Sequence, residues 1–131
     1  MPFAIRSALE GRITDKMSIP ALVAAAESVS RRYRREEARE GPQGFQIRSQ
    51  EEALSYAVAR MPATYAAVAR VLAELRRVLP DFSPQNVLDM GAGPATATLA
   101  ASQLYDLVSC CLVEPNAFLR AVGQEVTTEF L

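Results

Sequence analysis

Histidine is absent from this chain of 131 residues. The absence excludes histidine as a general base, as a metal ligand and as the partner of a Ser or Cys nucleophile. The only cysteines, Cys110 and Cys111, are neighbours, so they cannot form an ordinary disulfide without strain. Two cysteines do not make a structural zinc site, and we expect no metal. Because both lie in an apolar run, we expect buried free thiols.

Long apolar runs are also missing. No stretch approaches the roughly 20 residues needed to cross a bilayer, so we expect no membrane partner. Residues 1–20 include Glu10 and Asp15 and lack a continuous apolar core, which argues against a secretory signal or a transit peptide. Half of the chain is hydrophobic and 22% is charged. This composition favours one soluble globular domain and a cytoplasmic location.

Basic residues are scarce in the second part of the chain. Residues 1–80 hold 13 of the 14 Lys+Arg and 9 of the 15 Asp+Glu, a net charge of +4, whereas residues 81–131 have a net charge of −5. An arginine-weighted first part is compatible with a polyanion such as RNA. The candidate RNA-binding residues are Arg31, Arg32, Arg34, Arg35 and Arg60. The alternative for the run at 31–35 is a solvated helix face balanced by neighbouring glutamates.

The first 80 residues have the apolar spacing of helices. We predict a short helix over 3–10, and a longer one from Ser18 that ends at the loop 41–44. Its buried stripe would be Leu22, Ala25, Ala26, Val29 and Tyr33. A third helix begins at the capping sequence 49–52, and Pro62 should break or kink it near Met61. A further helix then covers 63–79.

The pattern changes after the rigid connector 80–84. Residues 86–90 predict a short strand, 91–94 a tight loop and 95–104 a helix of small residues. Residues 107–113 predict a buried parallel strand, and Asn116 should cap a last helix that runs towards Phe130. The fold class is therefore α/β. A helical region, 1–80, is followed by an incomplete Rossmann-like β-α-β-α unit, 81–131.

The strongest chemical signal is the sequence Leu-Asp-Met-Gly-Ala-Gly-Pro-Ala at 88–95. A strand that runs through a glycine-rich turn into a helix places a ligand at the carboxyl end of the strand. Backbone N–H groups at the start of the helix favour a carboxylate or a phosphate. The second strand ends at Glu114, whose carboxylate can accept hydrogen bonds from both hydroxyls of a ribose. The alternatives are a turn without a ligand and, for Glu114, a surface acid near a helix N-terminus.

The spacing of the glycines bears on the cofactor. A dinucleotide fingerprint, G-x-G-x-x-G, would need glycine where Thr96 stands, which disfavours an oxidoreductase fragment. Asp89, two residues before Gly91, resembles instead the D-x-G-x-G signature of S-adenosylmethionine methyltransferases. A third glycine is common in that family where this chain has Ala95, and we expect only mild crowding there. The predicted cofactor-binding residues are Asp89, Gly91, Ala92, Gly93, Glu114 and Pro115.

Three segments together carry a family resemblance: Ala-Arg-Met-Pro-Ala-Thr-Tyr-Ala-Ala-Val at 59–68, Pro-Asp-Phe-Ser-Pro at 80–84, and Val-Leu-Asp-Met-Gly-Ala-Gly-Pro at 87–94. They resemble the mitochondrial and bacterial small-ribosomal-subunit methyltransferase-like proteins over most of residues 18–122. The resemblance implies a class I methyltransferase fold, S-adenosylmethionine as the cofactor, and the small ribosomal subunit or its RNA as the partner. Mitochondrial members have a metal-binding cysteine set far downstream, for which this chain has no counterpart.

Two functional hypotheses remain open. The chain is either the amino-terminal part of a ribosomal RNA methyltransferase or a non-catalytic ribosome-assembly or RNA-binding factor with the same fold. Arg60 and Tyr65 would close the cofactor pocket or contact RNA, or else be a helix-end cation and a core residue. A doubly wound sheet needs strands on both sides of its switch point, and only two strands are predicted. We therefore expect exposed sheet edges and no methyl transfer by this chain alone. The sequence indicates no catalytic residue.

Overall fold

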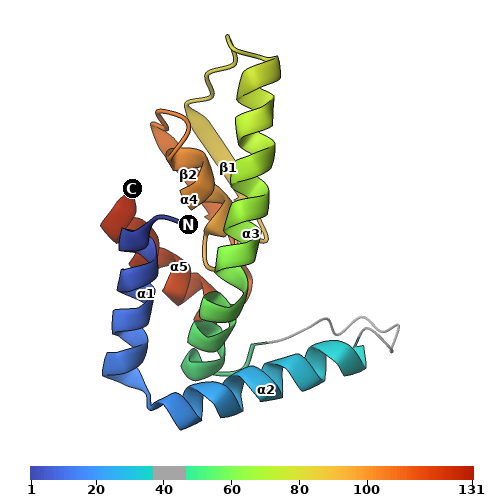
Figure 1. Cartoon of the computed structure of the whole chain (residues 1–131), viewed down its shortest axis with the longest axis vertical. Coiled ribbons are helices and arrows are strands. Elements are labelled where there is room, and N and C mark those ends of the chain that lie inside the picture. The colour runs from blue at the N-terminus through green and yellow to red at the C-terminus, as the bar shows by residue number, and fades with distance from the viewer. Residues whose placement is uncertain (37–46) are drawn as a thin grey trace.

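The computed structural model describes residues 1–36 and 47–131 (Figure 1). Its elements are α1 (Phe3–Lys16), α2 (Ile19–Glu36), α3 (Gln50–Val78), β1 (Asn86–Met90), α4 (Thr96–Ser102), β2 (Ser109–Val113) and α5 (Ala117–Phe130). Helices followed by a β-α-β-α arrangement confirm the predicted fold class. The loop predicted at 41–44 lies outside the described residues, and the division into two domains at residue 80 stays a prediction. Among the described helices, none combines the length and apolarity of a membrane span.

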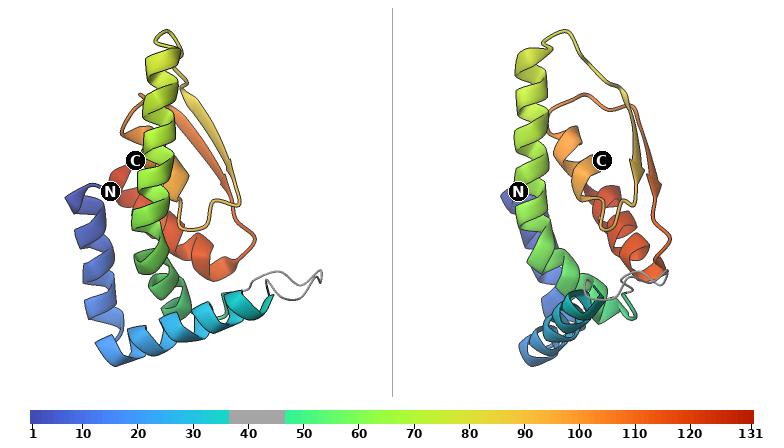
Figure 2. Two further views of the ribbon diagram at one scale, coloured as in Figure 1. Left: turned by 45° about the vertical axis from the view of Figure 1, so that its right-hand side comes forward. Right: turned by 90° about the vertical axis from the view of Figure 1, so that its right-hand side faces the viewer.

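The two strands pair in parallel, with Asn86 opposite Ser109 and Met90 opposite Val113. Helices α3, α4 and α5 all lie on one side of this small sheet, and the other side is open (Figure 2). Side chains on a strand alternate between the two faces. Consequently Leu88 and Met90, which point to the open side, are 62% and 72% exposed. The expectation of a buried second strand is wrong, because helices cover only one of its faces.

The core lies between α3 and the helices around it. Its buried side chains are Ile5, Leu9 and Ile13 from α1, Leu54, Ala57, Met61 and Tyr65 from α3, Leu99 from α4, and Leu119, Val122 and Val126 from α5. The recurrence of the α1 residues every four positions explains why this helix extends to Lys16, beyond the predicted 3–10. On α2, the predicted stripe is buried at Val29 and half-buried at its earlier positions. The side chain of Tyr33 lies outside the described part of the structure.

Pro62 does not interrupt α3, so a break at Met61 and a separate helix over 63–79 are wrong, while a kink at this point stays a prediction. A proline inside a helix removes one backbone hydrogen bond and crowds the carbonyl four residues earlier. Here the flanking Met61 and Tyr65 are both buried in the core. Tertiary packing holds both sides of the proline in one helix, because packing of an apolar face supplies most of the stability of helices in proteins. Arg60 therefore lies within a helix and not at a helix end.

The cysteines are less buried than the sequence predicts. Both are free, but Cys111 is exposed and Cys110 is only half-buried. They occupy adjacent positions on β2, so one faces the helices and the other faces the open side of the sheet. Burial raises the pKa of the Cys110 thiol, which keeps it protonated and poorly nucleophilic at neutral pH.

Candidate functional site

The loop between β1 and α4 has three residues with left-handed backbone conformations. The φ angles are 76° at Gly91, 54° at Gly93 and 63° at Ala95. Glycine adopts this region at no steric cost, which explains its presence at the first two positions. Ala95 carries a Cβ there at a cost of about 1–2 kcal/mol. The sequence predicts mild crowding at Ala95, and the structure gives a different physical reason for preferring glycine, namely the backbone conformation.

Hydrogen bonds hold this loop against the end of β2. The N–H groups of Gly91 and Ala92 donate to the carbonyl of Val113 at 2.8 and 3.1 Å. The N–H of Gly93 donates to Oε2 of Glu114 at 2.8 Å. Glu114 follows Gly93 by 21 residues in the sequence. The glycine turn and this acid therefore meet at the carboxyl ends of two parallel strands.

The Glu114 carboxylate is held in place on both of its oxygens. Oε2 accepts from Gly93, and Oε1 accepts from the N–H of Asn116 at 2.8 Å. The Asn116 side chain in turn caps α5, because its Oδ1 accepts from the N–H groups of Phe118 and Leu119. An ionised carboxylate has about four acceptor positions. Two of them are used in these contacts, and the other two have the chemistry to receive the hydroxyls of a diol.

Asp89 connects β1 to α4. Its Oδ2 accepts a hydrogen bond from the hydroxyl of Thr98 at 2.8 Å and a longer one from the Thr98 N–H at 3.3 Å. Thr98 is fully buried in the first turn of α4. A carboxylate at this end of a helix is favourable because of the exposed N–H groups and the helix dipole. The geometry gives Asp89 a structural task, and its contact with a cofactor stays a prediction.

Space beside the loop is open at both glycines. Apart from its chain neighbours, a Cβ added at Gly91 or at Gly93 would meet no atom of the described residues within 4 Å. A ligand can therefore approach this backbone directly, which is what the glycines in such a turn permit.

Gly123 on α5 is a site residue that the sequence reading did not single out. A Cβ at this position would lie 3.0 Å from the carbonyl oxygen of Gly93 and 3.5 Å from the nitrogen of Ala95. The missing side chain thus lets α5 pack directly on the glycine loop. A glycine inside a helical pattern is the signal that could have found it.

Arg120 on α5 donates hydrogen bonds to the segment that connects β2 to α5. One guanidinium nitrogen donates to the carbonyl of Glu114 at 2.7 Å and to that of Pro115 at 3.4 Å. Pro115, a predicted cofactor residue, is exposed beside these contacts.

A cavity of about 200 Å³ lies beside the loop, between the end of β2 and α5. Its lining residues are Ala92, Gly93, Leu112, Glu114, Arg120, Gly123, Gln124 and Thr127. Sites for small molecules and cofactors commonly measure about 300–1,000 Å³, so this cavity would enclose only part of a nucleoside-containing cofactor. Among the described residues, no group of three or more acidic or cysteine side chains is arranged to hold a metal ion.

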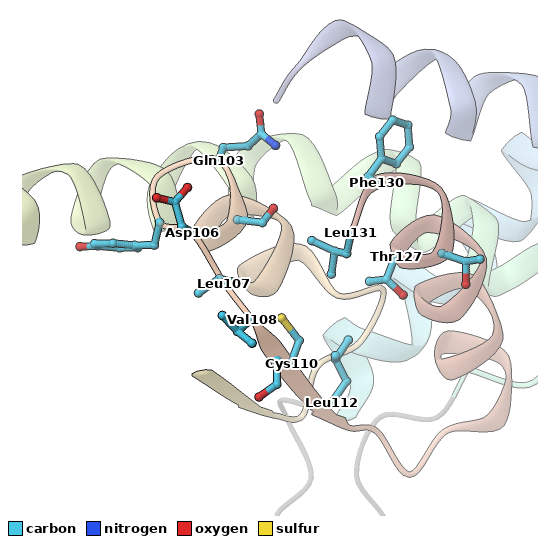
Figure 3. Close-up of a pocket in the computed structure, with 13 residues that line it drawn as sticks. Gln103, Asp106, Leu107, Val108, Cys110, Leu112, Thr127, Phe130 and Leu131 are labelled. Carbon is cyan, nitrogen blue, oxygen red and sulfur yellow. The ribbon is translucent and has the colours of Figure 1, made fainter. Parts of the chain in front are cut away.

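A larger hollow of about 530 Å³ lies towards the other end of β2. In Figure 3, Thr127, Phe130 and Leu131 at the end of α5 border this hollow opposite Cys110 and Leu112. The predicted cofactor residues are not among the 13 residues drawn there. Size alone would favour this hollow, but the glycine loop and its acid lie at the smaller cavity, and we assign the candidate site to the smaller one.

The structure describes the side chains of three of the five predicted RNA-binding arginines. Arg31 and Arg60 are exposed, on α2 and α3 respectively. Arg32 forms an ion pair with Glu52 and so connects the two helices. The side chains of Arg34 and Arg35 lie outside the described residues. Tyr65 is buried in the core, and its burial raises the pKa of its hydroxyl, which supports the structural reading of this residue.

Comparison with known families adds a finding that is independent of this geometry. A family model described as mitochondrial small ribosomal subunit Rsm22 matches residues 50–130, which is more than half of the chain. The matched segment includes α3, both strands, the glycine loop and all of α5. No curated protein matches the chain. The extent of the family match confirms the resemblance found in the sequence: the chain belongs to the Rsm22 family of mitochondrial small ribosomal subunit proteins.

Proposed function

We propose that this chain is the S-adenosylmethionine-binding part of a small-subunit ribosomal RNA methyltransferase-like protein that acts in ribosome maturation. The observation that carries the proposal is the 2.8 Å hydrogen bond between the Gly93 N–H and the Glu114 carboxylate. It brings a ribose-binding acid to a glycine turn at the carboxyl ends of two parallel strands, where folds of this type bind nucleotides. The family description supports the small ribosomal subunit as the partner.

The described residues fit such a cofactor in three ways. The backbone at Gly91 and Gly93 is open to approach, and Glu114 keeps acceptor capacity for a ribose while two N–H groups fix its carboxylate. The net charge of −5 over residues 81–131 favours a ligand that carries a positive sulfonium. When bound, the cofactor would supply an electrophilic methyl group. The chain's own part is to bind and orient the cofactor.

Titration calorimetry with S-adenosylmethionine tests the proposal. We expect binding by the native chain and at least about tenfold weaker binding by Glu114→Gln, because the charge that holds the diol is lost. Asp81→Asn makes the same change in charge at an exposed position of the connector and should bind like the native chain. Gly91→Arg should abolish binding by filling the open space. A folded sample that binds no cofactor, or an equal loss in Glu114→Gln and Asp81→Asn, would overturn the proposal.

The second candidate is a non-catalytic assembly factor that binds RNA and keeps the fold. The observation that favours it is the state of the loop, whose N–H groups at Gly91, Ala92, Gly93 and Ala95 already donate within the protein. The loop is thus satisfied without a ligand. Salt-sensitive binding of small-subunit RNA without binding of S-adenosylmethionine would decide for this candidate.

The cellular compartment in which the chain acts is also a part of the proposal. The composition predicts a cytoplasmic location, whereas the family description names the mitochondrial subunit. Localisation of a tagged chain in its own cells distinguishes the two.

A further inference from the structure

A third cavity, of about 170 Å³, lies between α2 and α3. Helix α2 crosses the lower end of α3 in both Figure 1 and Figure 2. The cavity is lined by Ala26, Val29 and Ser30 from α2 and by Ser55, Tyr56, Ala59 and Arg60 from α3. It shares no lining residue with the glycine loop. Val29 and Ser55 are buried, while Ala59 and Arg60 are exposed, so the cavity runs from a buried interior to the surface.

Ser55 is the unusual member of this lining. Ser55 is 2% exposed, and among the described residues its hydroxyl has no hydrogen-bond partner. Buried polar groups in native proteins are almost always hydrogen-bonded, so an exception of this kind requires an explanation. A hydroxyl can both donate and accept. The wall of the cavity therefore contains a hydroxyl with an unused donor and an unused acceptor, and Ser30, Tyr56 and Arg60 are the other polar residues of the lining.

We propose that this cavity receives one unpaired nucleobase of RNA, an inference that rests on the RNA partner in the proposed function. A nucleobase has flat apolar faces and a polar edge. Proteins that read single-stranded RNA stack such bases on aromatic rings or arginine planes and hydrogen-bond their edges. Tyr56 and Arg60 supply the ring and the guanidinium, and Ser55 supplies the hydrogen-bonding group. The volume suits one planar ring system and is too small for a whole nucleoside cofactor.

Charges around the cavity agree with a strand of RNA that passes over it. Arg31 follows the lining residue Ser30 and is exposed, and Arg60 is exposed on the facing helix. Phosphates on either side of an inserted base would meet these two cations. Of the nearby acids, Glu52 is neutralised by Arg32. Glu27, one turn before Arg31, is exposed and would be the acid that the phosphates avoid.

The test compares two ligands of equal charge by fluorescence anisotropy at fixed salt. One is a short single-stranded RNA of mixed sequence, and the other is an abasic oligomer of the same length. We expect the native chain to bind the RNA about tenfold more tightly than the abasic oligomer, because one stacked base contributes a gain of that order.

Three variants locate the effect. Ala59→Leu fills the mouth of the cavity and should remove the preference for the base-bearing RNA while leaving the abasic affinity unchanged. Ala63→Leu makes the same change one turn further along α3, outside the lining, and should keep the preference. Ser55→Ala deletes an unpaired hydroxyl, so it should fold normally and still reduce the preference for RNA. Thermal melts of all variants establish that they are folded.

The possible failures are distinct. Equal binding of RNA and the abasic oligomer by the native chain overturns the base cavity but leaves the RNA partner standing. Equal effects of Ala59→Leu and Ala63→Leu also overturn the cavity. No binding of either oligomer overturns both the cavity and the RNA partner, whereas the cofactor part of the proposed function is decided by calorimetry alone.

Discussion

Ala95 combines a left-handed backbone with a fully buried methyl group. Replacement by glycine would relieve a backbone cost of about 1–2 kcal/mol. It would also lose a buried methyl worth about 0.8 kcal/mol and add freedom to the unfolded chain worth about 0.4–1 kcal/mol. These terms nearly cancel, so the alanine at this point of the loop is tolerable although it is not the easiest residue for the conformation.

Ala95→Gly should change the free energy of unfolding by less than about 1 kcal/mol, whereas Ala95→Val should lower it by about 2–4 kcal/mol, because a branched side chain suits neither the left-handed backbone nor the closed space. Urea denaturation measures both variants. A large loss of stability in Ala95→Gly would contradict the left-handed conformation.

Gly123 and Gly11 form a matched pair of helical glycines. Outside its own stretch of helix, a Cβ at Gly11 in α1 would meet no atom of the described residues within 4 Å, whereas one at Gly123 would press on the carbonyl oxygen of Gly93. Gly11→Ala should therefore raise the free energy of unfolding by up to about 1 kcal/mol through helix propensity. Gly123→Ala should be less stable than Gly11→Ala by about 1–3 kcal/mol, because a backbone neighbour cannot move aside without cost.

The contact at Gly123 also has a functional readout. Since α5 packs on the glycine loop at this residue, Gly123→Ala should weaken binding of S-adenosylmethionine in calorimetry, and Gly11→Ala should not. Equal stability of the two variants would mean that α5 and the loop have room to separate.

At the scale of elements, the contact between α2 and α3 contains a partly buried ion pair. Burial raises the pKa of Glu52. Hydrogen bonds from the Arg32 side chain and the Arg48 N–H, together with the charges of both arginines, lower it by more than burial raises it. The resulting pKa therefore lies below the usual value of 4.5. A carboxyl whose pKa is lowered on folding stabilises the protein above its unfolded pKa. That contribution is lost as the pH falls through the lowered pKa of the folded state.

Glu52→Gln should therefore lower the free energy of unfolding by about 1–3 kcal/mol at neutral pH. The difference from the native chain should shrink as the pH falls below the usual glutamate pKa, because the native carboxylate is then protonated too. Urea denaturation over a range of pH measures this. Glu10→Gln alters an ion pair with Arg6 in which both side chains are more than half exposed, and it should have little effect at any pH. An effect of Glu52→Gln that does not depend on pH would exclude the ion pair as its cause.

At the scale of the whole molecule, the open side of the sheet is an exposed surface with apolar side chains on both strands. Leu88 and Met90 on β1 lie beside Cys111 and Val113 on β2, and all four are exposed. Two strands are too few to be stable without support, and here the support comes from the helices on the other face. Contiguous apolar patches are uncommon on the surface of monomeric proteins, whereas isolated apolar side chains are normal.

The native chain should therefore bind an apolar fluorescent dye without denaturant. The double change Leu88→Gln with Met90→Gln should reduce the fluorescence clearly, while Val71→Gln, at a position that is 66% exposed on α3, should not. Thermal melts should show that the double variant stays folded. Unchanged fluorescence in the double variant would place the dye elsewhere on the molecule.

The spacing of residues along the sequence determined the secondary structure and the local turns of this protein. The order of helices and strands, the glycine turn at 91–93 and the cap at Asn116 depend on residues close together in the chain, which is why they could be predicted. The meeting of Glu114 with Gly93 was also predictable, because the carboxyl ends of adjacent parallel strands must lie side by side.

Tertiary structure decided the rest. Packing on both sides of Pro62 overrode the local tendency of proline to end a helix. The helices cover only one face of the sheet, so strand residues that were predicted to be buried are exposed. The approach of Gly123 to Gly93 and the cavity at Ser55 each depend on helices that meet only after folding. No spacing along the chain encodes those distances, because they follow from how whole elements pack.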